Sequence, residues 1–373
     1  MIVVHIIEPF ASGVALFVKS LTKVLDSDEH IVIHGERKDE IEADLVKKGF
    51  LTPNVKFIPW RSAHRKLSLK DIKAFFEIYT ILKRLKSAGL CDVVHLHSAK
   101  SGFLGRIACR MLGLKNVFYT PNGASFLSTN SKVKRFLFQS LEVFADRVCG
   151  KVICSSVSEF NEYKKLGITA LYVNNGVESI FKTDSSTINC PKKFRIITCG
   201  RIVEQKNPGL FNEIASYFVG LDNFEFLWVG DGPESVKLTA KNIKVTGWLE
   251  RHVVHDLIRG ADVYISTSNY EGLSFAVLEA MSLKKVLLLS DCVGNKDIIK
   301  RGMNGDLFSK ANTAIAKIIH YQNNREMLSV MGEVSKDIKR VEYDMTNNYK
   351  IYKEIYLGNL TSGRKYIKTW KFN

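Results

Sequence analysis

The stretch "DVYISTSNYEGLSFAVLEAMS" (residues 262–282) joins a strand-like run to a helix-like run through a short polar loop. Apolar residues dominate "DVYIS", and after the loop they recur at helical spacing, which predicts a helix over 273–284. A strand followed by a helix is the repeating unit of a parallel α/β sheet. Two carboxylates interrupt the pattern: Glu271 stands at the turn, and Glu279 lies on the helix face that should be buried.

The same alternation runs through the rest of the 373-residue chain. The strand candidates are 2–7, 30–35, 55–59, 92–97, 117–120, 151–156, 194–200, 224–230, 243–247, 262–266 and 285–290. The helix candidates of the first half are 14–25, 70–87, 101–112 and 131–147. The polar stretch 174–193 breaks the rhythm and is interpreted as a linker. We therefore expect an α/β protein with two doubly wound parallel-sheet domains, 1–173 and 194–354, whose ligands bind beyond the carboxyl ends of the strands.

The net charge of +16 is the one unusual bulk property, and it is unevenly placed. Residues 1–173 hold 26 Lys and Arg against 16 Asp and Glu. Such an excess suggests an anionic partner: a phospholipid surface, a phosphate-bearing substrate or nucleic acid. The basic segments 60–79, which includes Trp60, and 364–373 resemble anchors for an anionic membrane more than a nucleic-acid module. The alternative for the first of them is a solvated helix face.

The cysteines and the apolar runs indicate a compartment. The seven cysteines form no Cys-x-x-Cys pair, which fits a reduced setting better than a disulfide framework. The first strand is too short for a signal peptide, and no run approaches the roughly 18 apolar residues of a membrane helix. We expect a cytoplasmic protein, with peripheral contact at the inner face of the plasma membrane left open.

The loop between the two carboxylates has the chemistry of an anion site. Gly272 lets a ligand approach the backbone, and the amides of 272–275 form a helix N-terminus. A buried carboxylate at Glu279 needs a hydrogen-bonding partner, and a vicinal diol satisfies both of its oxygens. The alternative is that Glu271 caps the helix and Glu279 pairs with a nearby lysine.

The motif S-x-x-E-G-L-x-x-x-x-L-E-A-M within this stretch resembles the donor site of retaining GT-B glycosyltransferases of the family-four, or group 1, type. "CGRIVEQKNP" (199–208) resembles the GR-x4-K segment of that family, and three weaker matches appear in the expected order. These are "VNNGVE" (173–178), "WVGDGP" (228–233) and "VTGWL" (245–249). The resemblance covers nearly the whole chain. It implies two Rossmann-like domains facing a central cleft, with the terminal segment from about 355 to 373 crossing back to the first domain.

The resemblance also implies roles in the second, donor-binding domain. Arg201 and Lys206 would clamp the diphosphate of a nucleotide sugar, which agrees with the preference of a dianion for two cations. Glu271 would contact the donor sugar and Glu279 the ribose hydroxyls. The implied donor-binding set is Gly13, Arg201, Lys206, Gly230, Glu271, Gly272, Leu273, Ser274 and Glu279. Taken alone, each cation is better explained as a solvated surface charge.

In the first, acceptor-binding domain the matches are looser. "EPFASG" (8–13) stands where the family has a double-glycine loop, so Gly13 is the candidate there, and a simple strand-to-helix turn is the alternative. In "DVVHLHS" both histidines fall on one strand face, and His97 at its carboxyl end matches a family histidine near the reacting sugar. A structural histidine is the alternative. Asn122 replaces the histidine of a family T-x-H-G loop; it keeps hydrogen bonding but loses protonation near neutral pH.

The implied reaction is transfer of a hexose or N-acetylhexosamine, with retention, from a nucleotide sugar (UDP favoured) to a hydroxyl of a lipid-linked or polysaccharide acceptor in capsule or O-antigen synthesis. His97, Glu271, Arg201 and Lys206 are the catalytic candidates, and the departing diphosphate would help deprotonate the acceptor. No metal or cofactor is expected, because "DSD" (26–28) reads as a solvated turn and no His/Cys cluster has metal-ligand spacing. A nucleotide-sugar epimerase and a basic nucleic-acid-binding protein are the alternatives, although no nucleic acid partner is expected.

Overall fold

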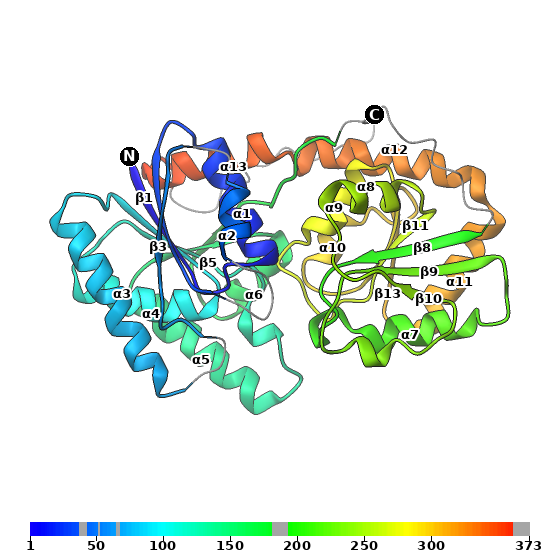
Figure 1. Cartoon of the computed structure of the whole chain (residues 1–373), viewed down its shortest axis with the longest axis horizontal. Helices are drawn as coiled ribbons and strands as arrows, with labels where there is room; N and C mark the ends of the chain where they lie inside the picture. Colours follow the sequence, from blue (N-terminus) through cyan, green and yellow to red (C-terminus); the bar gives the residue numbers. More distant parts are fainter. Residues whose placement is uncertain (37–42, 51–52, 65–67, 181–192, 361–373) are drawn as a thin grey trace. The chain divides into compact units, whose positions relative to one another are not determined.

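The computed structural model describes residues 1–36, 43–50, 53–64, 68–180 and 193–360 (Figure 1). The described residues form two compact units: one contains Met1–Asn175 together with 345–360, and the other contains Gly176–Asp344. The chain returns to the first unit at Met345, before the expected position 355. Most of the expected linker, residues 181–192, lies outside the described residues, as does the basic segment 364–373.

Within the described residues, the first unit has a seven-stranded parallel sheet in the order β3-β2-β1-β4-β5-β6-β7. Its strands are β1 (Ile2–Ile7), β2 (Glu29–His34), β3 (Val55–Pro59), β4 (Val93–His97), β5 (Val117–Thr120), β6 (Lys151–Cys154) and β7 (Ala170–Tyr172). Its helices are α1 (Ser12–Val24), α2 (Ala43–Lys48), α3 (Lys70–Ser87), α4 (Ala99–Met111), α5 (Lys132–Val148), α6 (Val157–Lys165) and α13 (Met345–Tyr356), with the 3₁₀ turn η1 (Ser125–Leu127). The strand order reverses between β1 and β4, and ligands of such sheets bind at that switch point.

The two faces of this sheet differ because side chains alternate along each strand. One face is aliphatic and packs against α3 and α4 in a core that includes Trp60. Trp60 is fully buried and its Nε1 donates to the Ala74 carbonyl at 3.1 Å, so the expectation that it belongs to a membrane anchor is wrong. The opposite face carries buried histidines under rings of α1 and α13, such as Phe17 and Tyr352.

Helix α13 is tied to the first unit by polar contacts as well as by its rings. Lys353 of α13 pairs with the Asp28 carboxylate, and the Tyr356 hydroxyl lies 2.6 Å from His95 Nδ1. Asp28 is only 3% exposed, so the expectation that "DSD" is a solvated turn fails at this residue. Its partner lies some 325 positions along the chain, which a local pattern cannot show.

The second unit has, within its described residues, a six-stranded parallel sheet in the order β10-β9-β8-β11-β12-β13. Its strands are β8 (Phe194–Cys199), β9 (Phe224–Val229), β10 (Ile243–Val245), β11 (Val263–Ser266), β12 (Val286–Ser290) and β13 (Gly305–Phe308). Its helices are α7 (Pro208–Tyr217), α8 (Arg251–Arg259), α9 (Phe275–Ser282), α10 (Asn295–Ile298), α11 (Ala311–Asn323) and α12 (Arg325–Glu342), with the 3₁₀ turns η2 (Glu204–Lys206) and η3 (Ser235–Lys237). Here the order reverses between β8 and β11.

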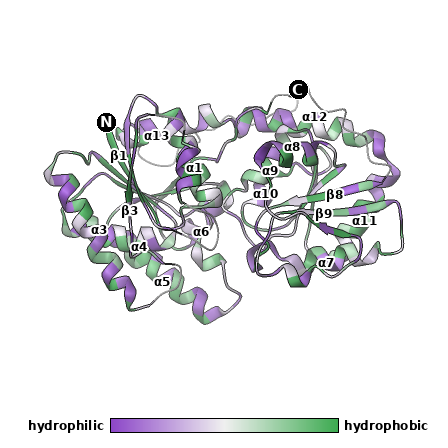
Figure 2. Cartoon of the chain, viewed as in Figure 1, coloured by the Kyte–Doolittle hydropathy of each residue, from purple (hydrophilic) through white to green (hydrophobic). Residues whose placement is uncertain are grey.

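These elements follow the hydrophobic pattern of the sequence. The central strands are buried on both faces, which explains their continuous apolar runs. Most helices carry both hydrophobic and hydrophilic residues (Figure 2). The helix predicted over 273–284 is shorter, Phe275–Ser282, because the chain turns at Lys284 with φ of +59°. Among the described helices, none combines the length and apolar character needed to cross a membrane.

Candidate functional site

The loops after β8 and β11 meet at the switch point of the second unit and are joined by hydrogen bonds. The Asn269 amide donates to the Gln205 carbonyl at 2.8 Å, and Gln205 Nε2 donates to the Tyr270 carbonyl at 3.1 Å. Thr267 Oγ1 donates to the Lys206 carbonyl at 2.7 Å. The turn η2, which carries Lys206, is therefore fixed against the loop that carries Glu271.

An ion pair closes this junction. Lys206 Nζ donates to Glu271 Oε1 at 2.6 Å, and the Glu271 side chain is 7% exposed against 21% for Lys206. The aliphatic stem of Lys206 lies beside Gly200, and a Cβ at this glycine would lie 3.4 Å from Lys206 Cε. A buried carboxylate without a partner is costly, and Lys206 supplies the partner of Glu271. The site thus brings together two of the predicted residues.

Glycine is required where the strand-end loops touch. Gly230, after β9, has φ of +137°, and a Cβ there would lie 2.3 Å from the Gly200 carbonyl oxygen. Gly294 lies against Glu271 in the same way: a Cβ at Gly294 would lie 2.8 Å from Glu271 Cβ. The Glu271 amide donates to the Val293 carbonyl at 2.9 Å. The loop after β12 therefore packs on Glu271, and the loops after β8 and β9 pack on each other, with no room for a side chain at Gly294 or Gly230.

Helix α9 starts beside Glu271. Gly272, Leu273 and Ser274 lead into it; Leu273 and Ser274 are buried, and the Ser274 side chain makes no capping hydrogen bond. The first amides of a helix have no partner within the helix and attract anions. The amides at the start of α9 therefore suit an anionic group of a ligand beside Lys206.

Glu279 lies one turn further along α9 and has a second pair of partners. It is 8% exposed, and its Oε1 accepts from Arg251 Nη2 of α8 at 2.6 Å. His255 Nε2 of the same helix lies 3.8 Å from Oε2. Burial by itself would raise the pKa of Glu279, but His255 and Arg251 outweigh it and lower that pKa. Glu279 is therefore ionised and can accept hydroxyl donors through its remaining lone pairs.

Both carboxylates affect the pKa of Tyr264, a buried residue of β11. The pKa of Tyr264 is raised well above its usual value, mainly by burial, and the charges of Glu271 and Glu279 add to the increase. The Tyr264 hydroxyl accepts from the Cys199 amide at 3.3 Å, at the end of β8. The two acids therefore belong to one electrostatic site on the carboxyl edge of this sheet.

The remaining predicted residues are distributed over both units. Arg201 follows Gly200 and is half-buried. In the first unit Gly13 is exposed in the first turn of α1, after Ser12, whose φ of +50° favours glycine. That conformation accounts for the double glycine expected at this loop.

Asn122 and His97 lie at the carboxyl ends of β5 and β4. Asn122 has φ of +55°, a conformation that asparagine tolerates well, and its Nδ2 donates to the Thr120 carbonyl at 3.3 Å. The next amide, Gly123, donates to Glu159 Oε1 at 2.9 Å, which holds the loop. His97 is fully buried and contacts His5. His97 and His95 do share one strand face, as predicted.

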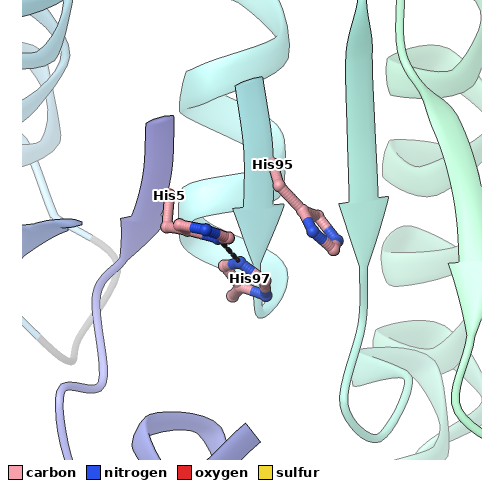
Figure 3. A group of neighbouring side chains, drawn as sticks. All are labelled: His5, His95 and His97. Atoms are coloured by element: carbon pink, nitrogen blue, oxygen red, sulfur yellow. Dashed lines mark hydrogen bonds between the residues drawn. The ribbon is translucent and has the colours of Figure 1, made fainter. Parts of the chain in front are cut away.

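Two groups of residues at these sheet edges were not predicted from the sequence. Arg251 and His255 stand four positions apart on one face of α8, a spacing that the sequence does contain. His5, His95 and His97 form a cluster whose nitrogens lie within 4.8 Å of one another (Figure 3). They come from two strands, so their spacing along the chain gives no metal-ligand pattern.

The sequence matches known families along both units. Residues 193–324 match the family described as "Glycosyl transferases group 1", and residues 41–156 match "Glycosyl transferase 4-like". The chain is 30% identical over 323 residues to the UDP-Gal:alpha-D-GlcNAc-diphosphoundecaprenol alpha-1,3-galactosyltransferase of Escherichia coli, covering 78% of this chain and 79% of that relative.

Solved structures share the fold at low sequence identity. The sucrose-phosphate synthase of Thermosynechococcus elongatus has a TM-score of 0.79 at 14% identity, covering 96% of this chain and 99% of that one. HepE of Anabaena in complex with UDP-glucose has a TM-score of 0.75 at 16% identity, covering 96% and 100%. The chain therefore belongs to the group 1 glycosyltransferases and has their GT-B fold of two parallel-sheet α/β units.

Proposed function

We propose that this glycosyltransferase moves a hexose or N-acetylhexosamine from a nucleotide sugar, with UDP as the favoured nucleotide, to a hydroxyl of a lipid-linked or polysaccharide acceptor. One observation carries the proposal: two buried carboxylates, each held by a cation, flank the start of α9 at the carboxyl edge of the second unit. The relative from Escherichia coli is named for UDP-Gal and a diphosphoundecaprenol acceptor, and HepE binds UDP-glucose. Both names support the choice of donor.

The donor's parts match the groups present. Glu279 binds the ribose diol through its free lone pairs while Arg251 keeps it charged. Arg201 and Lys206 bind the diphosphate together with the amides at the start of α9. Lys206 is then shared between Glu271 and phosphate, and Glu271 orients the donor sugar through its hydroxyls.

The reaction needs no protein nucleophile. The acceptor oxygen bonds to the anomeric carbon on the face that the diphosphate leaves, the bond from that carbon to the diphosphate oxygen breaks, and the acceptor proton passes to the diphosphate. The anomeric configuration is retained. Lys206, Arg201 and the α9 amides stabilise the negative charge that grows on the diphosphate, which is where such groups lower a barrier most. We propose that no metal is required, since these groups supply that charge.

The first unit is proposed to bind the acceptor near His97, Gly13 and Asn122, and to contact anionic lipid through a basic apolar surface on α3 and α5. The exposed apolar residues of this surface are Leu69, Ile72 and Phe76 at α3 and Val133, Phe136, Leu137 and Phe144 of α5. Those of α5 recur on one helix face, and exposed Lys132, Lys134 and Arg135 surround its first turn. Both α3 and α5 pack on α4.

A surface with aromatic residues and cations at its rim fits the headgroup region of an anionic bilayer. In the described part of the expected segment 60–79 the exposed large apolar residues are Leu69, Ile72 and Phe76, whereas Trp60 is internal. A lipid-linked acceptor would then reach the enzyme from the membrane. We propose action on the cytoplasmic face of the membrane, in the assembly of a surface polysaccharide such as capsule or O-antigen.

The experiment is a transfer assay with a panel of nucleotide sugars, preceded by a screen for thermal stabilisation. UDP-sugars are expected to stabilise the protein, and Glu279→Ala is expected to abolish transfer while the fold persists. Glu333→Ala, an exposed carboxylate that pairs with Lys284, is the matched control. Wild-type turnover in Glu279→Ala would remove the assignment, and conversion of the nucleotide sugar without acceptor would favour an epimerase.

A further inference from the structure

A row of buried histidines crosses three strands of the first unit. His30 on β2, His5 on β1 and His97 on β4 are all fully buried. His30 Nδ1 lies 3.1 Å from His5 Nε2, and His5 Nδ1 lies 3.1 Å from His97 Nε2. Figure 3 shows the contact between His5 and His97. At the other end of the row, His30 Nε2 lies 3.0 Å from the Leu25 carbonyl oxygen.

Burial keeps these rings uncharged. Desolvation is the largest cause that lowers the pKa of His5, His30 and His97, and neighbouring imidazoles lower it further for His5 and His97. Each ring near neutral pH therefore carries one N–H and one lone pair. Each contact in the row must then have one donor and one acceptor.

The Leu25 carbonyl fixes the direction of every bond. A carbonyl oxygen only accepts, so His30 Nε2 carries its proton and His30 Nδ1 must accept from His5 Nε2–H. His5 Nδ1 must in turn accept from His97 Nε2–H. The result is that His97 Nδ1 holds a bare lone pair, and this atom is buried with no hydrogen-bond partner in the structure. A buried polar atom without a partner calls for an explanation.

We propose that His30 and His5 are positioning residues that hold His97 in its Nε2–H tautomer, so that its Nδ1 accepts a hydrogen bond from a sugar hydroxyl at the carboxyl edge of β4. The inference rests on the proposed function, which places a sugar at this edge. In this arrangement His97 acts as a neutral acceptor and is neither a donor nor a cation toward the sugar. If the ring could change tautomer, Nδ1 would carry a hydrogen for part of the time. In that form Nδ1 could not accept a hydrogen bond from the sugar hydroxyl.

A metal ion is the competing occupant of this region, because His5, His95 and His97 are close together. The hydrogen bonds of these histidines argue against a bound metal ion. His95 Nδ1 contacts the Tyr356 hydroxyl at 2.6 Å and His95 Nε2 contacts Thr120 Oγ1 at 2.8 Å, so both nitrogens of His95 are engaged. The His5 and His97 nitrogens that face each other share a proton instead of a metal.

The test uses the full-length protein labelled with ¹⁵N-histidine, and His97→Gln assigns the signals of His97. We expect ring nitrogen shifts of a single neutral Nε2–H tautomer at pH 7. His30→Phe removes the first link, and we expect mixed tautomers at His97 with transfer lowered roughly five- to tenfold, the effect of one neutral hydrogen bond. The control is His34→Phe, a buried histidine of the same strand that bonds the Gly35 carbonyl outside the row.

The outcomes separate the parts of the inference. A neutral Nδ1–H tautomer or an imidazolium at His97 in the wild type would overturn the relay, as would stoichiometric Zn²⁺ that shifts the His5, His95 and His97 signals together. A changed tautomer in His30→Phe with unchanged turnover would overturn the role in transfer. If no nucleotide sugar is turned over by the wild type, the proposed function fails, while the tautomer measurement still decides the relay.

Discussion

The two units place polar groups at equivalent switch points but treat charge in opposite ways. In the second unit Glu271 and Glu279 are buried, and each pairs with a cation, Lys206 and Arg251 respectively. In the first unit the histidines of β1, β2 and β4 are buried and uncharged, and their partners are each other, a hydroxyl or a carbonyl. The charged site suits a diphosphate, whereas the neutral row suits hydroxyl groups and depends on remaining unprotonated.

Among the four changes that follow, Lys206→Ala is expected to have the largest effect. It removes the cation from Glu271 and from the proposed diphosphate site, so kcat/KM should fall roughly 100- to 1,000-fold, as for loss of a group that stabilises transition-state charge. The control is Lys237→Ala, whose lysine pairs with Glu234 within one turn at the surface. Steady-state kinetics with the accepted nucleotide sugar measures both. Equal losses of kcat/KM in the two variants would show that the net charge of the protein is responsible, and not the position of Lys206.

Acid should weaken the first unit through its histidines. Burial lowers the pKa of His95 to about 3, below the usual 6.5, so the unfolded chain binds more protons between these values. Stability is full above pH 6.5 and falls as the pH drops, by about 1.4 kcal/mol per pH unit for such a histidine. Urea unfolding from pH 7 to 4 measures the slope. His95→Gln should flatten it, and an unchanged slope would contradict the assignment.

Membrane contact should respond to Phe136→Asp. This change puts a charge in the basic apolar surface of α5, and we expect about tenfold weaker binding to vesicles that contain anionic lipid. Tyr217→Asp, at an exposed aromatic of α7 in the second unit, is the control. Vesicle sedimentation at low and high salt checks both variants. Binding that depends on neither substitution would place the membrane contact elsewhere.

The smallest effect concerns Arg251→Ala. Arg251 holds Glu279 at 2.6 Å but is half-exposed, so we expect a loss of about fivefold in UDP affinity. The loss should vanish for 2′,3′-dideoxy-UDP, because the arginine acts through the carboxylate on the ribose diol. Calorimetry compares the two ligands, with His252→Ala of the same helix as control. Equal losses for both ligands would mean that Arg251 touches another part of the nucleotide.

Much of the fold could be predicted because most strands are rich in apolar residues and are separated by polar loops. The exception is Trp60, which looked like a surface anchor beside cations but fills the core under α3. Short elements such as α2 and β7 carried too little periodicity. The return of the chain at Met345 depends on contacts of α13 with β-strand residues far away in sequence, so no local signal marks it.

The candidate site was predictable where a motif lies within one loop, as for Glu271 and Glu279. Its partners were harder to find. The pairing of Lys206 with Glu271 and of Arg251 with Glu279 joins residues 65 and 28 positions apart, respectively. The histidine row joins three strands, and the direction of its hydrogen bonds comes from a single carbonyl of Leu25. Such facts depend on how strands are ordered in the sheet.

The diphosphate site of the second unit is tested by the affinity of the protein for UDP and for uridine, measured by calorimetry in the wild type and in Lys206→Ala. If the edge formed by Lys206, Arg201 and the start of α9 binds diphosphate, the substitution lowers the affinity for UDP by at least about tenfold. The affinity for uridine, which has no diphosphate, stays unchanged. Equal UDP affinity in the two proteins would contradict the account.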